Sequence, residues 1–186
     1  MGKQKKIIAI DPGTVLSAYC VMTEDYEPTA AAKVDNNALH SLILRGGMDE
    51  MAIECMEPRF LGGKGTAGQM IGSETYEACI WIGRYMELAM NMNMPVHRVY
   101  RSEERSRLIP SKRNGLQPLP EGTGQTADAQ IRAALIQRFA KHDLKNGKGT
   151  AKRKDTFYGF KADMWSAFAI GVVHLDREKE RRSQGL

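Results

Sequence analysis

The sequence is poor in cysteine and has no long hydrophobic run. Its three cysteines, Cys20, Cys55 and Cys79, are scattered and odd in number, which argues against a disulfide framework and against a cysteine metal site. We expect them to be small buried apolar residues. The apolar runs are far too short to span a bilayer, and the basic N-terminus lacks a signal-like apolar core. We therefore expect an intracellular protein without a membrane association.

A phosphate-binding loop of the Walker type is also missing. The stretch from Phe60 to Gly72 is rich in glycine, but no Lys-Ser/Thr pair follows its last glycine at the start of a helix. We interpret it as a loop that handles the substrate, with Phe60 at its start and Lys64 within it.

Length and charge favour one domain with a polyanionic partner. The 186 residues suit a single domain over 1–175, followed by a charged tail over 176–186 that is frayed or contacts DNA. The net charge is +5, and the basic residues gather in 101–113, 141–154 and 177–182. Such clusters suit phosphate backbones, although a single cluster can also be a solvated surface.

A carboxylate ends the first apolar run. Residues Ile7 to Ile10 predict a buried strand that stops at Asp11, and Pro12-Gly13 then predicts a turn into a second strand. An acid at this position is costly unless a cation meets it. The alternative is that Asp11 is an ordinary turn former.

A second carboxylate interrupts the apolar run from Met51 to Met56. Glu54 is expected to be paired or bound to a cation if this strand is buried. The alternative is an edge strand with Glu54 in water.

Three helices are predicted further along the chain. Ser73 to Asn91 places Trp81 and Tyr85 on one face, which favours a core helix and, secondarily, a dimer contact. Asp128 lies in the first turn of a later helix, where the helix dipole alone can explain an acid. Asp163 marks the N-terminal turn of the last helix, where capping alone can explain it. Residues 34–44 are an edge element or short helix, 102–124 a long connection, and 141–158 a basic loop.

Four sequence blocks in this order resemble RuvC-type Holliday junction resolvases, particularly their phage and prophage branch. The blocks begin at Ile8, Ala52, Ala127 and Lys161, and read IAIDPGT, AIE, ADAQIR and KADMWSA. The segment EACIWIGR from Glu77 looks like the same branch. Asp-Pro-Gly-Thr is a weak signal by itself, whereas four blocks in register are specific.

The resemblance implies an RNase H-like fold, a five-stranded mixed sheet flanked by helices. It also implies a homodimer that nicks four-way DNA junctions by hydrolysis with two Mg²⁺ ions, or Mn²⁺, leaving 5′-phosphate and 3′-hydroxyl ends. Asp11, Glu54 and Asp163 would be metal ligands, with Asp128 a less certain fourth. One departure concerns Ser166, where bacterial members carry a further Asp. Asp128 is the candidate substitute for that missing carboxylate.

The expected DNA contacts are basic side chains and one loop aromatic that would wedge at the branch point. They are Phe60, Lys64, Arg101, Arg105, Arg107, Lys112, Arg113, Lys152, Arg153 and Lys154.

Two other functions compete with this hypothesis. An actin-like or sugar-kinase-like ATPase also begins with a strand ending in Asp-x-Gly-Thr, but it needs two such domains. A DNA-binding module that has lost catalysis is the second alternative, and Ser166 is its best argument.

Overall fold

A five-stranded sheet forms the centre of the protein. The computed structural model describes residues 4–57 and 73–185, so Phe60 and Lys64 lie outside the described residues. The strand order is β3-β2-β1-β4-β5. The strands are β1 (Lys6–Asp11), β2 (Leu16–Thr23), β3 (Pro28–Asp35), β4 (Glu50–Cys55) and β5 (Val96–Tyr100).

The sheet is mixed, as predicted. Strand β1 pairs antiparallel with β2 and parallel with β4, and β4 pairs parallel with β5. The apolar run from Ile7 to Ile10 is fully buried because it occupies the middle strand, covered on both faces. The predicted first hairpin is confirmed.

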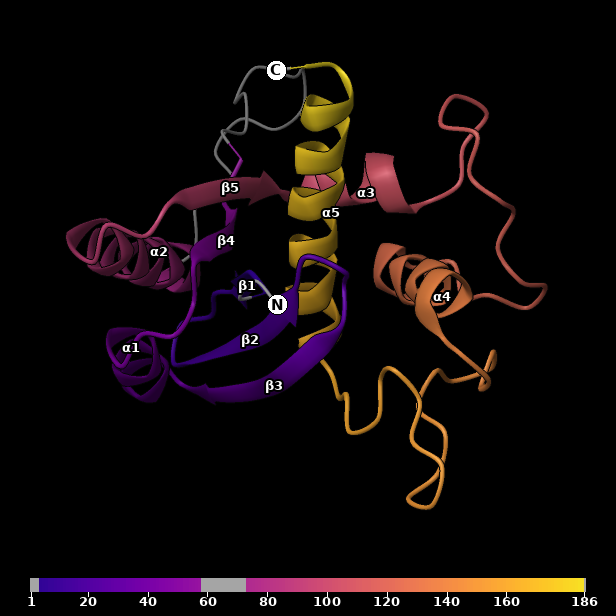
Figure 1. Cartoon of the computed structure of the whole chain (residues 1–186), viewed down its shortest axis with the longest axis horizontal. Coiled ribbons are helices and arrows are strands. Elements are labelled where there is room, and N and C mark those ends of the chain that lie inside the picture. Colours follow the sequence, from indigo (N-terminus) through magenta and orange to yellow (C-terminus); the bar gives the residue numbers. More distant parts are fainter. Residues whose placement is uncertain (1–3, 58–72, 186) are drawn as a thin grey trace.

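Helices cover both faces of the sheet (Figure 1). They are α1 (Asn36–Leu44), α2 (Ser73–Asn91), α3 (Arg101–Leu108), α4 (Ala127–Phe139) and α5 (Met164–Ser183). Helices α1 and α2 pack on one face; α5 crosses the other, with α3 and α4 against it. Two hydrophobic clusters, one on each side, form the core.

Helix α5 lies unusually close to the sheet. It contacts β1 and β2, and a Cβ atom on Gly171 would lie 2.3 Å from Met22 Sδ and 3.1 Å from Ala9 Cβ. The absence of a side chain at Gly171 therefore allows the helix backbone to approach the strands closely.

Several sequence-based expectations need correction. Residues 34–44, expected to be an edge element or short helix, comprise the end of the strand β3 and the helix α1, and the expected long connection begins with the helix α3. Helix α5 continues to Ser183, so most of the tail that was expected to be frayed is helical. Charged side chains of this part of the helix form ion pairs. Cys20 is buried, as expected, whereas Cys79 is exposed on α2 because it lies on the outer side of that helix.

Within the described residues, every helix is either too short or too polar to cross a membrane.

Candidate active site

Asp11 and Glu54 meet at one edge of the sheet. Ile10 pairs with Ile53 across the parallel strands β1 and β4, so the next residue of each strand, Asp11 and Glu54, emerges at the same carboxyl edge. The two carboxyl groups are close enough for each to shift the pKa of the other. The pairing of two acids predicted from separate stretches of sequence is the central feature of the site.

The pair carries unbalanced negative charge. Burial, followed by the charges of Glu54 and Asp163, raises the pKa of Asp11 to about 8. Burial also raises the pKa of Glu54, against the opposing effect of Arg101. Two partly buried acids with raised pKa values are arranged for a cation to take the place of a proton. Carboxylate oxygens are the ligands that Mg²⁺ and Mn²⁺ prefer.

Asp163 lies near this pair and is held by a lysine. It precedes α5 but makes no capping hydrogen bond, so the capping explanation does not apply. Instead, its carboxylate forms an ion pair with Lys33 of β3. Lys33 pairs in register with Ala18, which pairs with Asp11. Lys33, on β3, therefore lies at the same end of the sheet as Asp11, two strands away. No sequence motif indicated this position.

Asp128, in the first turn of α4, is bound to Arg101. Its side chain is 75% exposed and forms an ion pair with the Arg101 guanidinium. Thr126, not Asp128, caps α4 through a hydrogen bond from the Ala129 amide. Arg101, predicted as a DNA contact, thus lies among the acids and links Asp128 to the site.

Glu104 is a buried acid that sequence reasoning missed. Its side chain is fully buried, and one oxygen accepts a hydrogen bond of 2.9 Å from Arg101. The other oxygen has no hydrogen-bond partner among the described residues. Burial and the charge of Glu54 raise its pKa to about 8. The mostly charged sequence of α3 gave no sign that this residue faces inward.

The predicted ligands are less tightly gathered than another group. Among the described residues, Glu50, His97 and His174 place one ligand atom each within 4.8 Å of one another, whereas Asp11, Glu54 and Asp163 do not form such a group. In this structure Lys33 and Arg101 form ion pairs with the outer acids, Asp163 and Asp128.

Some of the remaining side chains predicted to contact DNA are engaged in contacts within the protein, and others are exposed to solvent. Arg107 is engaged by Glu180 through hydrogen bonds of 2.8 and 3.0 Å. The Lys154 ammonium lies 4.9 Å from the centre of the Tyr158 ring. The others that the structure describes are exposed: Arg105, Lys112, Arg113, Lys152 and Arg153.

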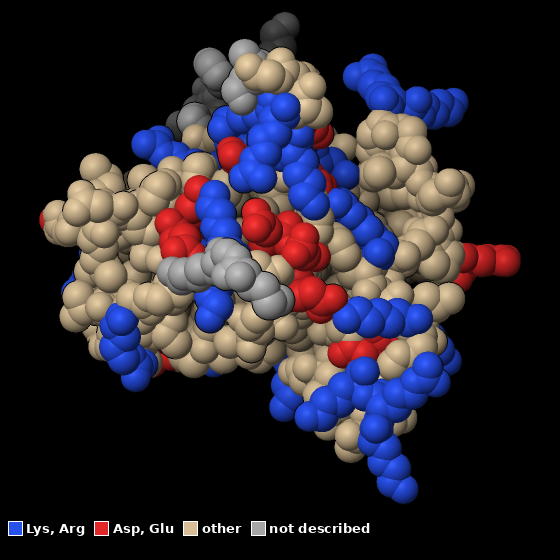
Figure 2. Space-filling view, in the orientation of Figure 1, with Lys and Arg blue, Asp and Glu red and all other residues tan. Residues whose placement is uncertain are grey.

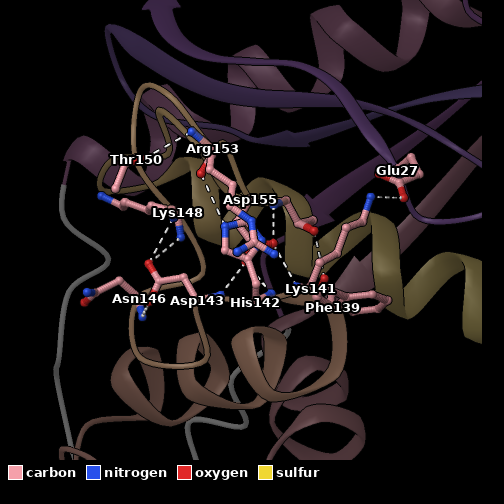
Figure 3. Close-up of polar contacts among 12 residues, drawn as sticks. Glu27, Phe139, Lys141, His142, Asp143, Asn146, Lys148, Thr150, Arg153 and Asp155 are labelled. Carbon is pink, nitrogen blue, oxygen red and sulfur yellow. Dashed lines mark hydrogen bonds and ion pairs between the residues drawn. The ribbon is translucent and has the colours of Figure 1, made fainter.

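The basic loop is shaped by two carboxylates, those of Asp155 and Asp143 (Figure 3). Asp155 accepts hydrogen bonds from the amides of Lys141, His142, Asp143 and Thr156 at 2.6–2.8 Å. Burial alone would raise the pKa of Asp155, but these amides together outweigh it and lower the pKa.

A second acid of the loop repeats this arrangement. Asp143 accepts from the amides of Asn146, Lys148 and Gly149. A bridge between Gly149 and Lys154 closes the tip. The loop is therefore an ordered platform that holds exposed cations outward.

Charge is segregated on the face shown in Figure 2. Lys and Arg side chains gather over the basic loop and over the C-terminal half of α5, while acidic side chains gather between them (Figure 2). Lys and Arg exceed Asp and Glu by 27 to 22 in the whole chain, so their grouping matters more than the modest net charge.

Comparison with solved structures identifies the fold. The chain is similar to Thermus thermophilus RuvC in complex with Holliday junction substrate, with a TM-score of 0.59 and 12% identity over 95% of this chain and 96% of that chain. A second Thermus thermophilus RuvC structure matches with a TM-score of 0.57 and 12% identity, covering 94% of this chain and 96% of that chain. No protein-family model and no curated protein matches the sequence. The predicted RNase H-like fold is confirmed.

Proposed function

We propose that this protein is a metal-dependent endonuclease that resolves four-way DNA junctions. The carrying observation is the pair of partly buried acids Asp11 and Glu54, each of which shifts the pKa of the other, at the adjoining ends of two strands of a RuvC-type fold. The similar Thermus thermophilus RuvC was solved with a Holliday junction substrate, and the exposed cations of this chain suit branched DNA.

Asp11, Glu54 and Asp163 would hold Mg²⁺ or Mn²⁺, with Asp128 as a fourth ligand. The fit rests on oxygen donors and on the raised pKa values of Asp11 and Glu54, which signal missing positive charge. When bound, the ions would activate water and stabilise the leaving oxygen of the phosphodiester. Lys33 would have to leave Asp163 for a metal ion to bind there, and Arg101 would exchange its acidic partner for phosphate oxygens as DNA arrives.

The cations of the basic loop and of α3 would hold the DNA backbone. Exposed Lys152 and Arg153 sit on the ordered loop, and phosphate contacts make affinity fall steeply with salt. Binding to a junction that does not weaken with rising salt would contradict this assignment.

We further propose that the protein acts as a homodimer, since two nicks in one junction need two active sites. The outer side of α2 exposes Tyr76 and Ile80, 59% and 53% accessible, one helical turn apart. Sedimentation of the free protein and of its junction complex tests this state.

The decisive experiment compares a labelled four-way junction with a linear duplex of the same sequence. Paired nicks in the junction alone, lost with chelator and with Asp11→Asn, are expected. The exposed acid Glu121 provides the control: Glu121→Gln should cut normally. Resealing of the nicks by DNA ligase would test for 5′-phosphate and 3′-hydroxyl ends.

A binding module without catalysis is the second candidate. It is favoured by Ser166, which supplies no carboxylate on the face of α5 next to Asp163. Tight junction binding without cutting in Mg²⁺ or Mn²⁺ would support it, and Ser166→Asp would then test whether one added acid restores cleavage. Asp128→Asn separately tests the fourth ligand.

A further inference from the structure

A second group of metal-binding side chains lies at the opposite end of the sheet. Glu50 begins β4, four residues before Glu54, and pairs in register with Ile7 near the start of β1. At ~3.3 Å per strand residue, Glu50 and Glu54 are separated by roughly 13 Å. This group is therefore distinct from the candidate active site.

Two histidines approach the same oxygen of Glu50. His174 Nε2, on α5, is 3.0 Å from Glu50 Oε2, and His97 Nε2, on β5, is 3.6 Å from it. The two imidazoles stack with ring centres 4.0 Å apart and planes 25° apart. All three ligand atoms lie within 4.8 Å of one another.

The polar groups here are incompletely satisfied. His97 Nε2 is buried and has no hydrogen-bond partner within the described part of the chain. Lys5 Nζ lies 2.5 Å from the other oxygen, Glu50 Oε1, which leaves Oε2 facing both imidazoles. A buried ring nitrogen without a partner is costly, and a cation between the three atoms would satisfy it.

The protonation states also suit a metal. Burial lowers the pKa of His97 and the pKa of His174, which favours neutral imidazoles. Burial opposes ionisation of Glu50, but hydrogen bonds from Lys5 and His174 outweigh it and lower the pKa of this acid. Neutral imidazole and ionised carboxylate are the forms that bind metal.

We propose that Glu50, His97 and His174 bind a Zn²⁺ ion, with water completing the coordination. Two imidazoles and one carboxylate are a recurrent zinc ligand set, and imidazole favours Zn²⁺ over Mg²⁺. The ion would join β4, β5 and α5, elements far apart in the sequence, and so stabilise the folded chain. This role is independent of DNA cleavage.

The test uses zinc chloride and the full-length protein after metal removal. Calorimetric titration in excess Mg²⁺, which fills oxygen-ligand sites, should show that one Zn²⁺ binds per chain. In thermal unfolding scans, the melting temperature should rise with increasing zinc concentration. His97→Gln should weaken this binding by at least about tenfold. The His97 side chain is 20% exposed, so this variant is expected to fold.

Matched variants separate the possible outcomes. His40→Gln, on α1, removes a histidine outside the group and should bind zinc normally. Glu50→Gln gives a second, isosteric loss of a ligand and should also weaken binding. Zinc binding that is abolished by Asp11→Asn but unchanged by His97→Gln and Glu50→Gln would overturn the proposal, as would a wild-type protein that binds no zinc.

Discussion

The carboxyl groups of Asp11 and Glu54 lie together across the adjoining ends of β1 and β4, where each shifts the pKa of the other. Two strands thus bring two acids to one partly buried place, where only one can readily ionise. Without a metal, ionisation of this acid is less favourable in the folded state than in the unfolded chain.

This relationship predicts a pH-dependent stability of the metal-free protein. The pKa of Asp11 rises from 3.8 to about 8 on folding, so between these values the folded state binds more protons than the unfolded state. Stability therefore decreases as pH rises through this window. Asp11→Asn removes the group and should make the decrease shallower.

Urea denaturation in chelator, repeated across this pH window, measures the effect. Glu104 has a pKa raised to about 8 as well, so part of the slope should persist in Asp11→Asn. The exposed Glu121 serves as control, and Glu121→Gln should keep the wild-type slope. Equal slopes in all three proteins would contradict the prediction.

The ion pair between Lys33 and Asp163 predicts that removing the lysine changes the Mg²⁺ concentration that cleavage requires. The Lys33 ammonium lies where it would repel a metal ion bound to Asp163. Lys33→Met should therefore lower the Mg²⁺ concentration for half-maximal cleavage by about threefold or more. The pair is 40% and 44% exposed, so stability should change by less than ~1 kcal/mol.

A Mg²⁺ titration of junction cleavage makes this measurement. Lys161→Met removes the same charge from an exposed position just before α5 and should leave the titration midpoint unchanged. If Lys33→Met slows cleavage at every Mg²⁺ concentration with an unchanged midpoint, Lys33 acts on the DNA rather than on metal binding.

The surroundings of Gly171 in α5 and of Gly83 in α2 predict opposite effects of an alanine at these two positions. Gly171→Ala would place its Cβ against Met22 and Ala9, and should destabilise the protein by about 1–3 kcal/mol through overpacking. Gly83 lies inside α2, and an alanine Cβ at this position would have no heavy atom within 4 Å. Gly83→Ala should stabilise by about 0.5–1 kcal/mol.

Urea midpoints with unchanged m-values would establish both effects. A Gly171→Ala protein as stable as Gly83→Ala would show that α5 can withdraw from the sheet at little cost.

The sequence predicted the two acids that end buried strands. The run from Ile7 to Ile10 is continuous and apolar, so the carboxylate at its end stands out, and Glu54 stands out because it interrupts the run from Met51 to Met56. Their contact follows once β1 and β4 are parallel neighbours. Local pattern and strand register together determine this part of the site.

The surrounding charges could not be predicted in this way. Lys33 lies in a half-exposed strand, and Glu104 in a helix of mostly charged sequence, so neither breaks a local pattern. Their roles depend on which residues the folded chain brings near them. The pairing of Glu50 with His174, separated by 124 positions, has the same origin.

The basic loop provides the last prediction, a structural test of DNA binding. Gly149 has φ of +65°, and a Cβ there would lie 2.2 Å from Arg153 O and 2.8 Å from Asp155 N. Gly149→Ala should therefore open the bridge to Lys154 and release the amides bound to Asp155. With its cations no longer held together, the protein should bind junctions several-fold more weakly.

Gly159 is the matched control, because its φ is +85° but no heavy atom lies within 4 Å of a Cβ at this position. Both alanine variants carry the backbone cost of positive φ, about 1–2 kcal/mol, and only Gly149→Ala adds the collision. Junction affinity should be measured over a range of salt concentrations. Relative to the wild-type protein, Gly149→Ala should lose more affinity than Gly159→Ala, and its affinity should depend less steeply on salt. Faster hydrogen exchange at the His142 and Asp143 amides should accompany this loss. Equal affinities together with faster exchange would show that the ordered loop does not hold DNA, and the phosphate contacts would then have to come from α3 and the segment after it.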